Sequence, residues 1–259
     1  MSENRPLILV TNDDGINAPG IRALIEVMNT LGDVMVVAPD SPQSGMGHAI
    51  TINDTLYCNS INVIKDAPHK EYSCSGTPVD CVKIAVNEIL KRKPDLCVSG
   101  INHGSNSSIN VIYSGTMSAA VEAGTQGIPS IGFSLLDYSL EADFGPSKKF
   151  VKAIAQQTLK NGLPKGVVLN VNIPKLNASE INGIKICRQA NAHWEEKFDK
   201  RTNPVGRDYY WLSGEFVNDD EGEDTDEWAL RNGYVSVVPV QFDLTAYRAM
   251  DELNSWELK

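Results

Sequence analysis

The sequence predicts an α/β protein built on a mostly parallel β-sheet that is flanked by helices. Three observations support this prediction. Short apolar runs alternate with helix-period segments through roughly the first 175 residues. Several of these runs are apolar at consecutive positions, which is typical of parallel strands buried on both faces. After residue 177, apolar and polar residues alternate instead, as they do in half-exposed strands.

The elements of the first part follow from this periodicity. Buried strands are expected at residues 7–11, 34–38, 96–99, 130–135 and 167–173. Helices are expected between them, at residues 20–31, 77–93, 116–127 and 147–161. Pro78 suits the first turn of the second helix, because the backbone N–H that proline lacks is not needed there. Two further segments are expected to form an antiparallel excursion from the sheet, at residues 50–58 and 71–74.

The last third of the chain is predicted to be a β-rich and helical extension. Strands are expected at residues 184–188, 208–216 and 233–240, with a polar, irregular stretch between the first two. Helices are expected at residues 225–232 and 246–257. The prediction is therefore a core of residues 1–177 that carries the functional loops, followed by an extension of residues 178–259. The extension is either a lobe of the same domain or an oligomerisation arm.

The composition excludes several kinds of partner. Acidic residues outnumber basic ones by 33 to 23, which gives a formal net charge of −10. No basic cluster offsets this charge, so duplex nucleic acid and an anionic membrane are not expected as partners. No stretch approaches the ~20 apolar residues that a membrane span requires. Much of the acidity lies in residues 219–227, which we expect to form a solvated loop leading into a helix.

The five cysteines are expected to be reduced thiols. They include no C-x-x-C pair and no spacing typical of a zinc site. An odd number of cysteines without such spacing favours mostly buried thiols in a cytoplasmic protein. The N-terminal residues show no secretory-signal pattern, which agrees with a cytoplasmic location.

Three polar loops follow three of the predicted buried strands. They cover residues 12–15, residues 40–48, and residues 99–106 with their continuation to residue 116. The carboxyl ends of parallel strands meet at one edge of a sheet, and ligand crevices form at that edge where the strand order reverses. We therefore expect the three loops to line a single site.

The first loop places Asp13 and Asp14 side by side at the end of a strand. Neighbouring carboxylates repel each other, and burial makes both charges harder to keep. A divalent cation such as Mg²⁺ removes this conflict, because it prefers oxygen ligands. The alternative is an ordinary turn, for which asparagine, aspartate and glycine are the usual residues.

The third loop has the features of an anion site. Ser114, Gly115 and Thr116 lead into a predicted helix, whose free N–H groups and dipole favour an anion such as phosphate. The alternative is that Ser114 or Thr116 only caps the helix. The chain has neither a Gly-Lys-Ser/Thr nor a G-x-G-x-x-G pattern, so binding of nucleoside triphosphates or dinucleotides is not supported.

Two histidines lie in the same loops. His48 and His103 are either proton donors to a leaving group or, more simply, hydrogen-bonding residues. Asp80 lies at a predicted helix start, where a carboxylate interacts favourably with the helix dipole, so a structural role is expected.

As an ordered set, these motifs resemble the SurE family, also called survival protein E. The matching segments are Asn12-Asp13-Asp14-Gly15, Ser44-Gly45, Gly76-Thr77-Pro78, Ser99-Gly100-Ile101-Asn102 with Gly104 and Asn106, and Tyr113-Ser114-Gly115-Thr116. Their order and spacing match over about the first 135 residues, and residues 224–236 resemble the C-terminal half of the family. The chain departs from many relatives at Gly47, where they have a serine, and at Gln43, where they have a basic residue.

The resemblance implies a metal-dependent nucleoside-monophosphate phosphatase with a Rossmann-like core. It implies one divalent cation per subunit, Mg²⁺ or Mn²⁺, held by Asp13, Asp14, Ser44 and Asn102. It implies that the substrate phosphate is bound by Gly45, Asn106, Ser114, Gly115 and Thr116. It further implies a C-terminal region exchanged between the subunits of a homodimer or homotetramer.

The expected reaction is hydrolysis of a nucleoside 5′-monophosphate, with 3′-monophosphates and short polyphosphate as further candidate substrates. Asp13 and Asp14 would be the catalytic carboxylates, anchoring a cation that polarises the phosphoryl group. Donors at Asn106 and residues 114–116 would stabilise charge on the phosphoryl oxygens. The alternatives are a non-enzymatic module that binds a phosphorylated metabolite and a metal-dependent glycosyltransferase, although the latter is disfavoured by the missing D-x-D motif.

Overall fold

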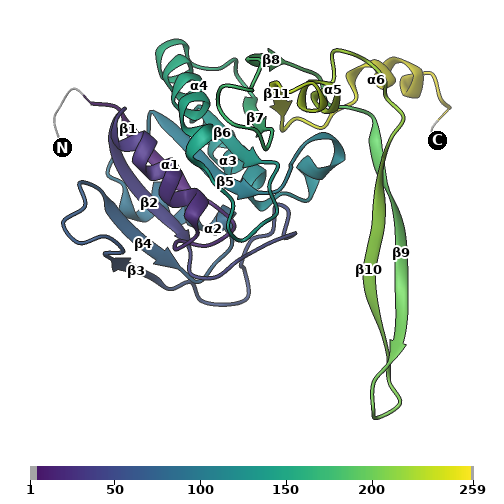
Figure 1. The fold of residues 1–259 in the computed structure, drawn as a ribbon, viewed down its shortest axis with the longest axis horizontal. Coiled ribbons are helices and arrows are strands. Elements are labelled where there is room, and N and C mark those ends of the chain that lie inside the picture. The colour runs from purple at the N-terminus through teal and green to yellow at the C-terminus, as the bar shows by residue number, and fades with distance from the viewer. Residues whose placement is uncertain (1–4, 258–259) are drawn as a thin grey trace.

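The computed structural model describes residues 5–257 and confirms the predicted α/β class. Within these residues, one sheet of nine strands has the order β3-β4-β2-β1-β5-β6-β7-β11-β8. Helices cover this sheet, and a separate two-stranded hairpin, β9–β10, projects far from the body of the molecule (Figure 1).

The elements have the following bounds. The strands of the main sheet are β1 (Leu7–Thr11), β2 (Asp33–Pro39), β3 (Cys58–Ile61), β4 (Lys70–Cys74), β5 (Leu96–His103), β6 (Ser130–Leu135), β7 (Val167–Ile173), β8 (Ile184–Ile186) and β11 (Val235–Gln241). The hairpin consists of β9 (Ala192–Thr202) and β10 (Asp208–Asn218). The α-helices are α1 (Pro19–Asn29), α2 (Pro78–Ile84), α3 (Gly115–Thr125), α4 (Lys148–Asn161), α5 (Asp226–Arg231) and α6 (Tyr247–Asn254). Shorter helical turns are η1 (Ala85–Ile89), η2 (Ser108–Ile112) and η3 (Gly145–Ser147).

The strand order places a topological switch point beside β1. The chain passes from β1 to its parallel neighbour β2, and later returns to β5, which pairs in parallel on the other side of β1. Loops after strands on opposite sides of such a point leave a crevice between them. The carboxyl ends of β1 and β5 therefore define where a ligand can bind.

Strand β1 is buried on both faces, as the sequence predicts. Ile8 and Val10 belong to the apolar cluster that includes α1, whereas Leu9 belongs to a second cluster with residues of α2 and α3. Successive side chains of a strand point to opposite faces, so β1 links two cores. Each such fully buried side chain stabilises the fold by about 1.5–3 kcal/mol, which fixes the strand that carries Asp13 and Asp14.

Gly20 lets helix α1 lie directly against strand β5. A Cβ added at this position would stand 1.9 Å from the carbonyl oxygen of Ile101 and 3.2 Å from the ring of Phe144. Only glycine permits so close an approach between a helix and a neighbouring backbone. The close packing of α1 on Ile101, the residue before the predicted site residue Asn102, therefore requires a residue without a side chain at position 20.

The predicted helix at residues 77–93 is confirmed as helical only to Ile89, changes from an α-helix to a π-helix after Ile84, and is wrong from Leu90 on. Helix α2 ends at Ile84 and continues as the π-helical turn η1, whose last hydrogen bond runs from the N–H of Leu90 to the carbonyl oxygen of Ala85 at 2.8 Å. Leu90 is then extended. The wide turn redirects the chain towards β5, which apolar periodicity could not indicate.

Strand β9 is absent from the prediction, which places an irregular stretch there. It pairs with β10 over its whole length, and after Ala192 all of its residues are exposed. The sequence of β9 consists largely of charged residues and shows no apolar alternation, whereas its equally exposed partner β10 does and was predicted at residues 208–216. The predicted strand at residues 50–58 is also largely wrong, because β3 begins only at Cys58.

The last third contributes to the main sheet as well as to the hairpin. Strand β11 pairs antiparallel with β7, and β8 pairs in parallel with β11. The main sheet thus contains strands from both sides of residue 177. The predicted division of the chain into a core and an extension at this residue stays a prediction.

All five cysteines are free, with Cys58 partly exposed and the others buried, as predicted. In the described part of the chain, residues 5–257, no helix has the length and apolarity needed to cross a membrane.

We expect Gly20→Ala to lower the free energy of unfolding by about 2 kcal/mol or more, because the new methyl group overlaps the β5 backbone. Urea unfolding would measure this change. Glu26→Ala on the exposed side of the same helix is the control, and it should cost less than about 1 kcal/mol, since it removes only a surface ion pair with Lys148. Equal effects of the two substitutions would contradict the close approach.

Candidate metal and phosphate site

The three predicted loops meet in one pocket at the carboxyl ends of β1, β2 and β5. Its volume is about 320 Å³. The predicted residues that line it are Asp13, Asp14, Ser44, Gly45, Asn102, Asn106 and Ser114. Its other lining residues are His103, Ser105, Asn110, Tyr113, Tyr138 and Trp194. Gly115 and Thr116 lie behind this lining, against Asp13.

Asp13 is buried between β1 and the first turn of α3. The backbone N–H of Thr116 donates to its Oδ2 at 3.0 Å, and the Thr116 hydroxyl donates to its Oδ1. A Cβ at Gly115 would stand 2.8 Å from the Cβ of Asp13, so glycine allows the helix to pack on this carboxylate. Both hydrogen-bond donors of Thr116 thus bond to Asp13. The predicted contact between Thr116 and phosphate stays a prediction.

The charge on Asp13 is costly in the absence of a cation. Burial, with a smaller contribution from the neighbouring Asp14 carboxylate, raises the pKa of Asp13 to about 6, although the hydrogen bonds from Thr116 oppose this rise. A bound divalent cation would stabilise both charged carboxylates. The turn interpretation is also satisfied here, because Asn12 Nδ2 donates to the carbonyl oxygen of Gly15 at 2.9 Å. The metal-site interpretation and the turn interpretation of residues 12–15 are therefore compatible.

Asp14 lies within hydrogen-bond distance of His103 in the pocket wall. Its Oδ2 lies 3.1 Å from His103 Nδ1 and 3.2 Å from the backbone nitrogen of the same residue. The edge of the Phe144 ring packs on the imidazole, with the ring centroids 4.9 Å apart. Of the two histidines that the sequence singled out, His103 is the one in the pocket.

Asn102 presents an oxygen to the site. Its Nδ2 donates to the carbonyl oxygens of His103 and Gly104, both at 3.0 Å. Because both N–H groups of the side chain donate to backbone carbonyls, its Oδ1 is free to coordinate a cation. Ser44 adds a hydroxyl from the loop after β2, next to Gln43, whose N–H donates to the carbonyl oxygen of Asp13 at 2.7 Å. Two carboxylates, one hydroxyl and one amide oxygen form a donor set that fits Mg²⁺ or Mn²⁺.

Asn106 is held by asparagines of β7 that the sequence analysis did not single out. Its backbone N–H donates to Asn172 Oδ1 and its carbonyl oxygen accepts from Asn170 Nδ2, each at 2.8 Å. Its Nδ2 donates to Ser134 Oγ at 2.8 Å. Buried asparagines at alternate positions of an otherwise apolar strand were the available sequence signal. This network fixes the Asn106 side chain near the N-terminus of α3.

Ser114 combines the two roles that the sequence left open. Its Oγ accepts from the N–H of Met117 at 3.0 Å and caps α3. Its side chain also lines the pocket, and its hydroxyl hydrogen is free to donate to an anion. The capping and phosphate-binding interpretations therefore do not exclude each other.

Asp226 connects the C-terminal part of the chain to the same loop. It is fully buried and accepts from the N–H groups of Ser108 and Ala190 at 2.8 and 2.9 Å. Burial raises its pKa, against these hydrogen bonds. The prediction that residues 219–227 form a wholly solvated run is thus wrong at Asp226. Its carboxylate holds the positive-φ backbone of Ser108 in place, two residues after Asn106.

Three aromatic side chains border the pocket; Tyr113 belongs to a matched motif but was given no role, and Tyr138 and Trp194 were not predicted. Tyr113, Tyr138 and Trp194 line it while remaining largely exposed. Trp194 comes from β9, and its Nε1 donates to Asn110 Oδ1 at 2.8 Å, which orients the indole. Trp194 lies in the stretch that was predicted to be irregular, so sequence reasoning gave it no position.

His48 lies outside the pocket lining. Its Nε2 is 3.1 Å from Glu122 Oε2 on α3, and Glu122 also accepts from Lys83 Nζ at 2.7 Å. The structural role predicted for Asp80 is confirmed, because Thr77 and Asp80 form a capping box at the start of α2.

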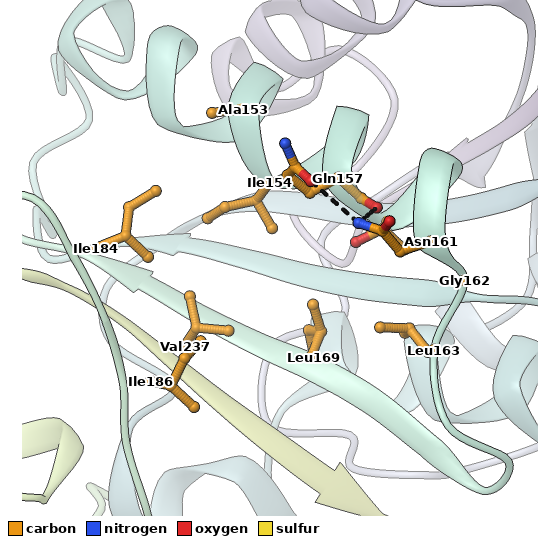
Figure 2. Close-up of a pocket in the computed structure, with 11 residues that line it drawn as sticks. Ala153, Ile154, Gln157, Asn161, Gly162, Leu163, Leu169, Ile184, Ile186 and Val237 are labelled. Atoms are coloured by element: carbon orange, nitrogen blue, oxygen red, sulfur yellow. Dashed lines mark hydrogen bonds between the residues drawn. The ribbon is translucent and has the colours of Figure 1, made fainter.

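A second cavity of about 320 Å³ lies between α4 and strands β7, β8 and β11 (Figure 2). Its wall is mostly apolar, with side chains such as Ile154, Leu169 and Ile186 directed into it. No residue that lines it is titratable.

Comparisons with known proteins found a matching family model and many similar proteins. A family model described as "Survival protein SurE" matches residues 8–196. A protein of Christiangramia forsetii described as "5'-nucleotidase SurE" is 76% identical over 258 residues, which cover 100% of this chain and 99% of the relative. A Bacteroides fragilis protein of the same description is 49% identical over 259 residues, covering 100% of both. The crystal structure of Sure protein from Aquifex aeolicus has a TM-score of 0.83 at 41% identity, covering 96% of this chain and 98% of that one.

The Glu122 carboxylate generates a prediction about pH. The hydrogen bond from His48 and the contact with Lys83 lower the pKa of Glu122 from 4.5 to about 2. A carboxylate with a lowered pKa stabilises the fold above its unfolded pKa, and this stability is lost as the pH falls through its folded pKa. We expect Glu122→Gln to reduce the free energy of unfolding near neutral pH, with the difference shrinking between about pH 4.5 and pH 2. Urea unfolding at stepped pH measures this, and a difference independent of pH would refute the assignment.

Proposed function

Because the chain belongs to the SurE family, we propose that it is a metal-dependent 5′-nucleotidase that hydrolyses nucleoside 5′-monophosphates to nucleoside and phosphate. The observation that carries this proposal is that Asp13 packs against the N-terminus of α3, while Asp14 lines the same pocket beside it. Two carboxylates that need a cation thus lie beside donors that favour an anion. A divalent cation held by the carboxylates would leave coordination positions for a phosphate ester, whose remaining oxygens would face the helix N-terminus.

In this proposal Asp13, Asp14, Ser44 and Asn102 hold one Mg²⁺ or Mn²⁺ ion. Such an ion, when bound, supplies Lewis acidity and lowers the pKa of a coordinated water. Thr116 keeps Asp13 oriented through two hydrogen bonds. His103 does the same for Asp14, which then orients the attacking water. The water oxygen forms the new bond to phosphorus as the bond to the 5′-oxygen breaks, and a water proton is transferred to the leaving oxygen.

The phosphate is placed at the start of α3. Ser114 can donate its hydroxyl hydrogen, Asn106 faces the same space, and Gly45 allows close approach from the opposite loop. Gly115 extends this surface at the helix N-terminus, where the dipole stabilises negative charge. Fixed donors of this kind stabilise the charge that develops on the phosphoryl oxygens.

The nucleoside is placed against the aromatic side of the pocket. Trp194 is held by Asn110, and Tyr113 and Tyr138 stand on the same rim. Bases stack on aromatic side chains with little preference for sequence, because every base has a π-face. This arrangement supports a nucleoside monophosphate over a small aliphatic phosphate, and 3′-monophosphates and short polyphosphate belong in the same assay panel.

We also propose that the protein is a homodimer or homotetramer that uses the hairpin and α6 as interfaces. The hairpin exposes Phe198, Tyr210 and Trp211, and none of the residues of α6 is buried. Exposed apolar surface of this extent is typical of interaction sites. The free cysteines support a reducing compartment, and we propose the cytoplasm.

Asp13→Asn should abolish release of phosphate from AMP in the presence of Mn²⁺, while leaving the fold intact. Asparagine can still accept from the Thr116 N–H and can donate to the Thr116 hydroxyl, so the local hydrogen bonds survive. In EDTA the variant should melt at a higher temperature than the original protein, because one buried charge is gone. Phosphate release is assayed over a panel of phosphomonoesters and metals. Full activity in this variant, or activity of the original protein unaffected by EDTA, would refute the metal role, and binding without turnover would indicate a non-enzymatic module.

Trp194→Ala should raise the KM for AMP by about tenfold, since stacking of one base on an aromatic side chain is worth ~1–3 kcal/mol. Ribose 5-phosphate carries no base, so its KM should change little. Glu195→Ala, at the next position of the hairpin, is the control and should leave both values as they are. An equal rise of KM for both substrates would argue against a base platform.

A further inference from the structure

The loop of residues 40–49 carries Ser44, yet apolar packing does little to hold it. Most of its residues are exposed, and Met46 is 44% exposed. Around Gly45, no heavy atom lies within 4 Å of the place where a Cβ would stand. A metal ligand on such a loop costs conformational entropy each time it is fixed. Something other than burial must align Ser44 with Asp13.

Polar contacts on both sides of Ser44 tie the loop down. Before it, the N–H of Gln43 donates to the carbonyl oxygen of Asp13 at 2.7 Å. After it, the N–H of Gly47 donates to the carbonyl oxygen of Tyr113 at 3.1 Å, and His48 Nε2 lies 3.1 Å from Glu122 Oε2. The contacts after Ser44 therefore both reach α3 or the residues just before it.

Glu122 is a firm anchor for this contact. Its side chain is 8% exposed, and Lys83 Nζ and Gln126 Nε2 donate to its Oε1 at 2.7 and 3.2 Å. Its Oε2 is left to face His48. Glu122 belongs to the same helix whose first turn holds Asp13 through Thr116. One rigid helix thus contacts both the buried carboxylate and the loop that bears the hydroxyl ligand.

We infer that His48 is a positioning residue, which aligns Ser44 with Asp13 by pairing with Glu122 and so fastening the 40–49 loop to α3. The inference rests on the metal site of the proposed function. His48 does not line the pocket, and its Nε2 is occupied by Glu122, so it acts through Ser44 and does not donate a proton to the leaving group.

The test is a Mn²⁺ titration of the metal-stripped protein, followed by electron paramagnetic resonance of the free ion. His48→Ala should raise the dissociation constant for Mn²⁺ by about three- to tenfold, as expected when one charge-assisted hydrogen bond restrains a loop. His48→Gln keeps an N–H donor and should recover part of the affinity. Ser41→Ala is the matched control, because its hydroxyl bonds only within the loop, and it should bind Mn²⁺ like the original protein.

Kinetics and hydrogen exchange separate positioning from proton donation. At saturating Mn²⁺ the kcat of His48→Ala should return to within about twofold of the original value, while the amide of Gly47 exchanges faster. A kcat that stays low at saturating Mn²⁺, or an unchanged Mn²⁺ affinity with unchanged Gly47 protection, would overturn the inference. Asp13→Asn distinguishes a failure of the proposed metal site from a failure of the inference about His48. If it binds Mn²⁺ normally, the proposed metal site fails, whereas if it loses binding and His48→Ala does not weaken it, only this inference fails.

Discussion

The buried charge of Asp13 is the constraint on which the rest of the site depends. The carboxylate stands at the end of a strand that is buried on both faces, and its two oxygens accept from the first turn of α3. Burial and Asp14 both work against its ionisation. A cation relieves that cost, and the helix N-terminus beside it favours an anion. The proposed metal and phosphate sites therefore lie side by side.

The surrounding polar network orients oxygen atoms without adding charge. Asn102 turns its N–H groups to backbone carbonyls and leaves an oxygen for the cation. Asn106 is held on three sides, by Asn170, Asn172 and Ser134. Buried amides that are fully hydrogen-bonded are rigid, because each lost bond would leave an unsatisfied group. The site is thus preorganised by segments far apart in sequence, including Asp226 near the C-terminal end.

How much of this could be predicted depends on the kind of signal. The buried strands and their loops follow from apolar runs, and the proposed metal and phosphate residues follow from motifs at the ends of those runs. Strand β9 and Trp194 were missed because β9 consists largely of charged residues and shows no apolar alternation. The π-turn after α2 was missed because a single wide turn does not interrupt helical periodicity. Membership of the SurE family, shown by relatives over the full chain, agrees with the motif-based resemblance.

The sequence alone determined the α/β class, the positions of the buried strands along the chain and the identity of the polar loops, since these depend on local periodicity and residue type. Only the tertiary structure decided which donors meet which acceptors. It assigned Thr116 to Asp13, His103 to Asp14 and His48 to Glu122, and it brought Trp194 to the rim of the pocket. The physical reason is that a hydrogen bond depends on ångström-scale placement of atoms from distant segments, and packing around β1 fixes that placement.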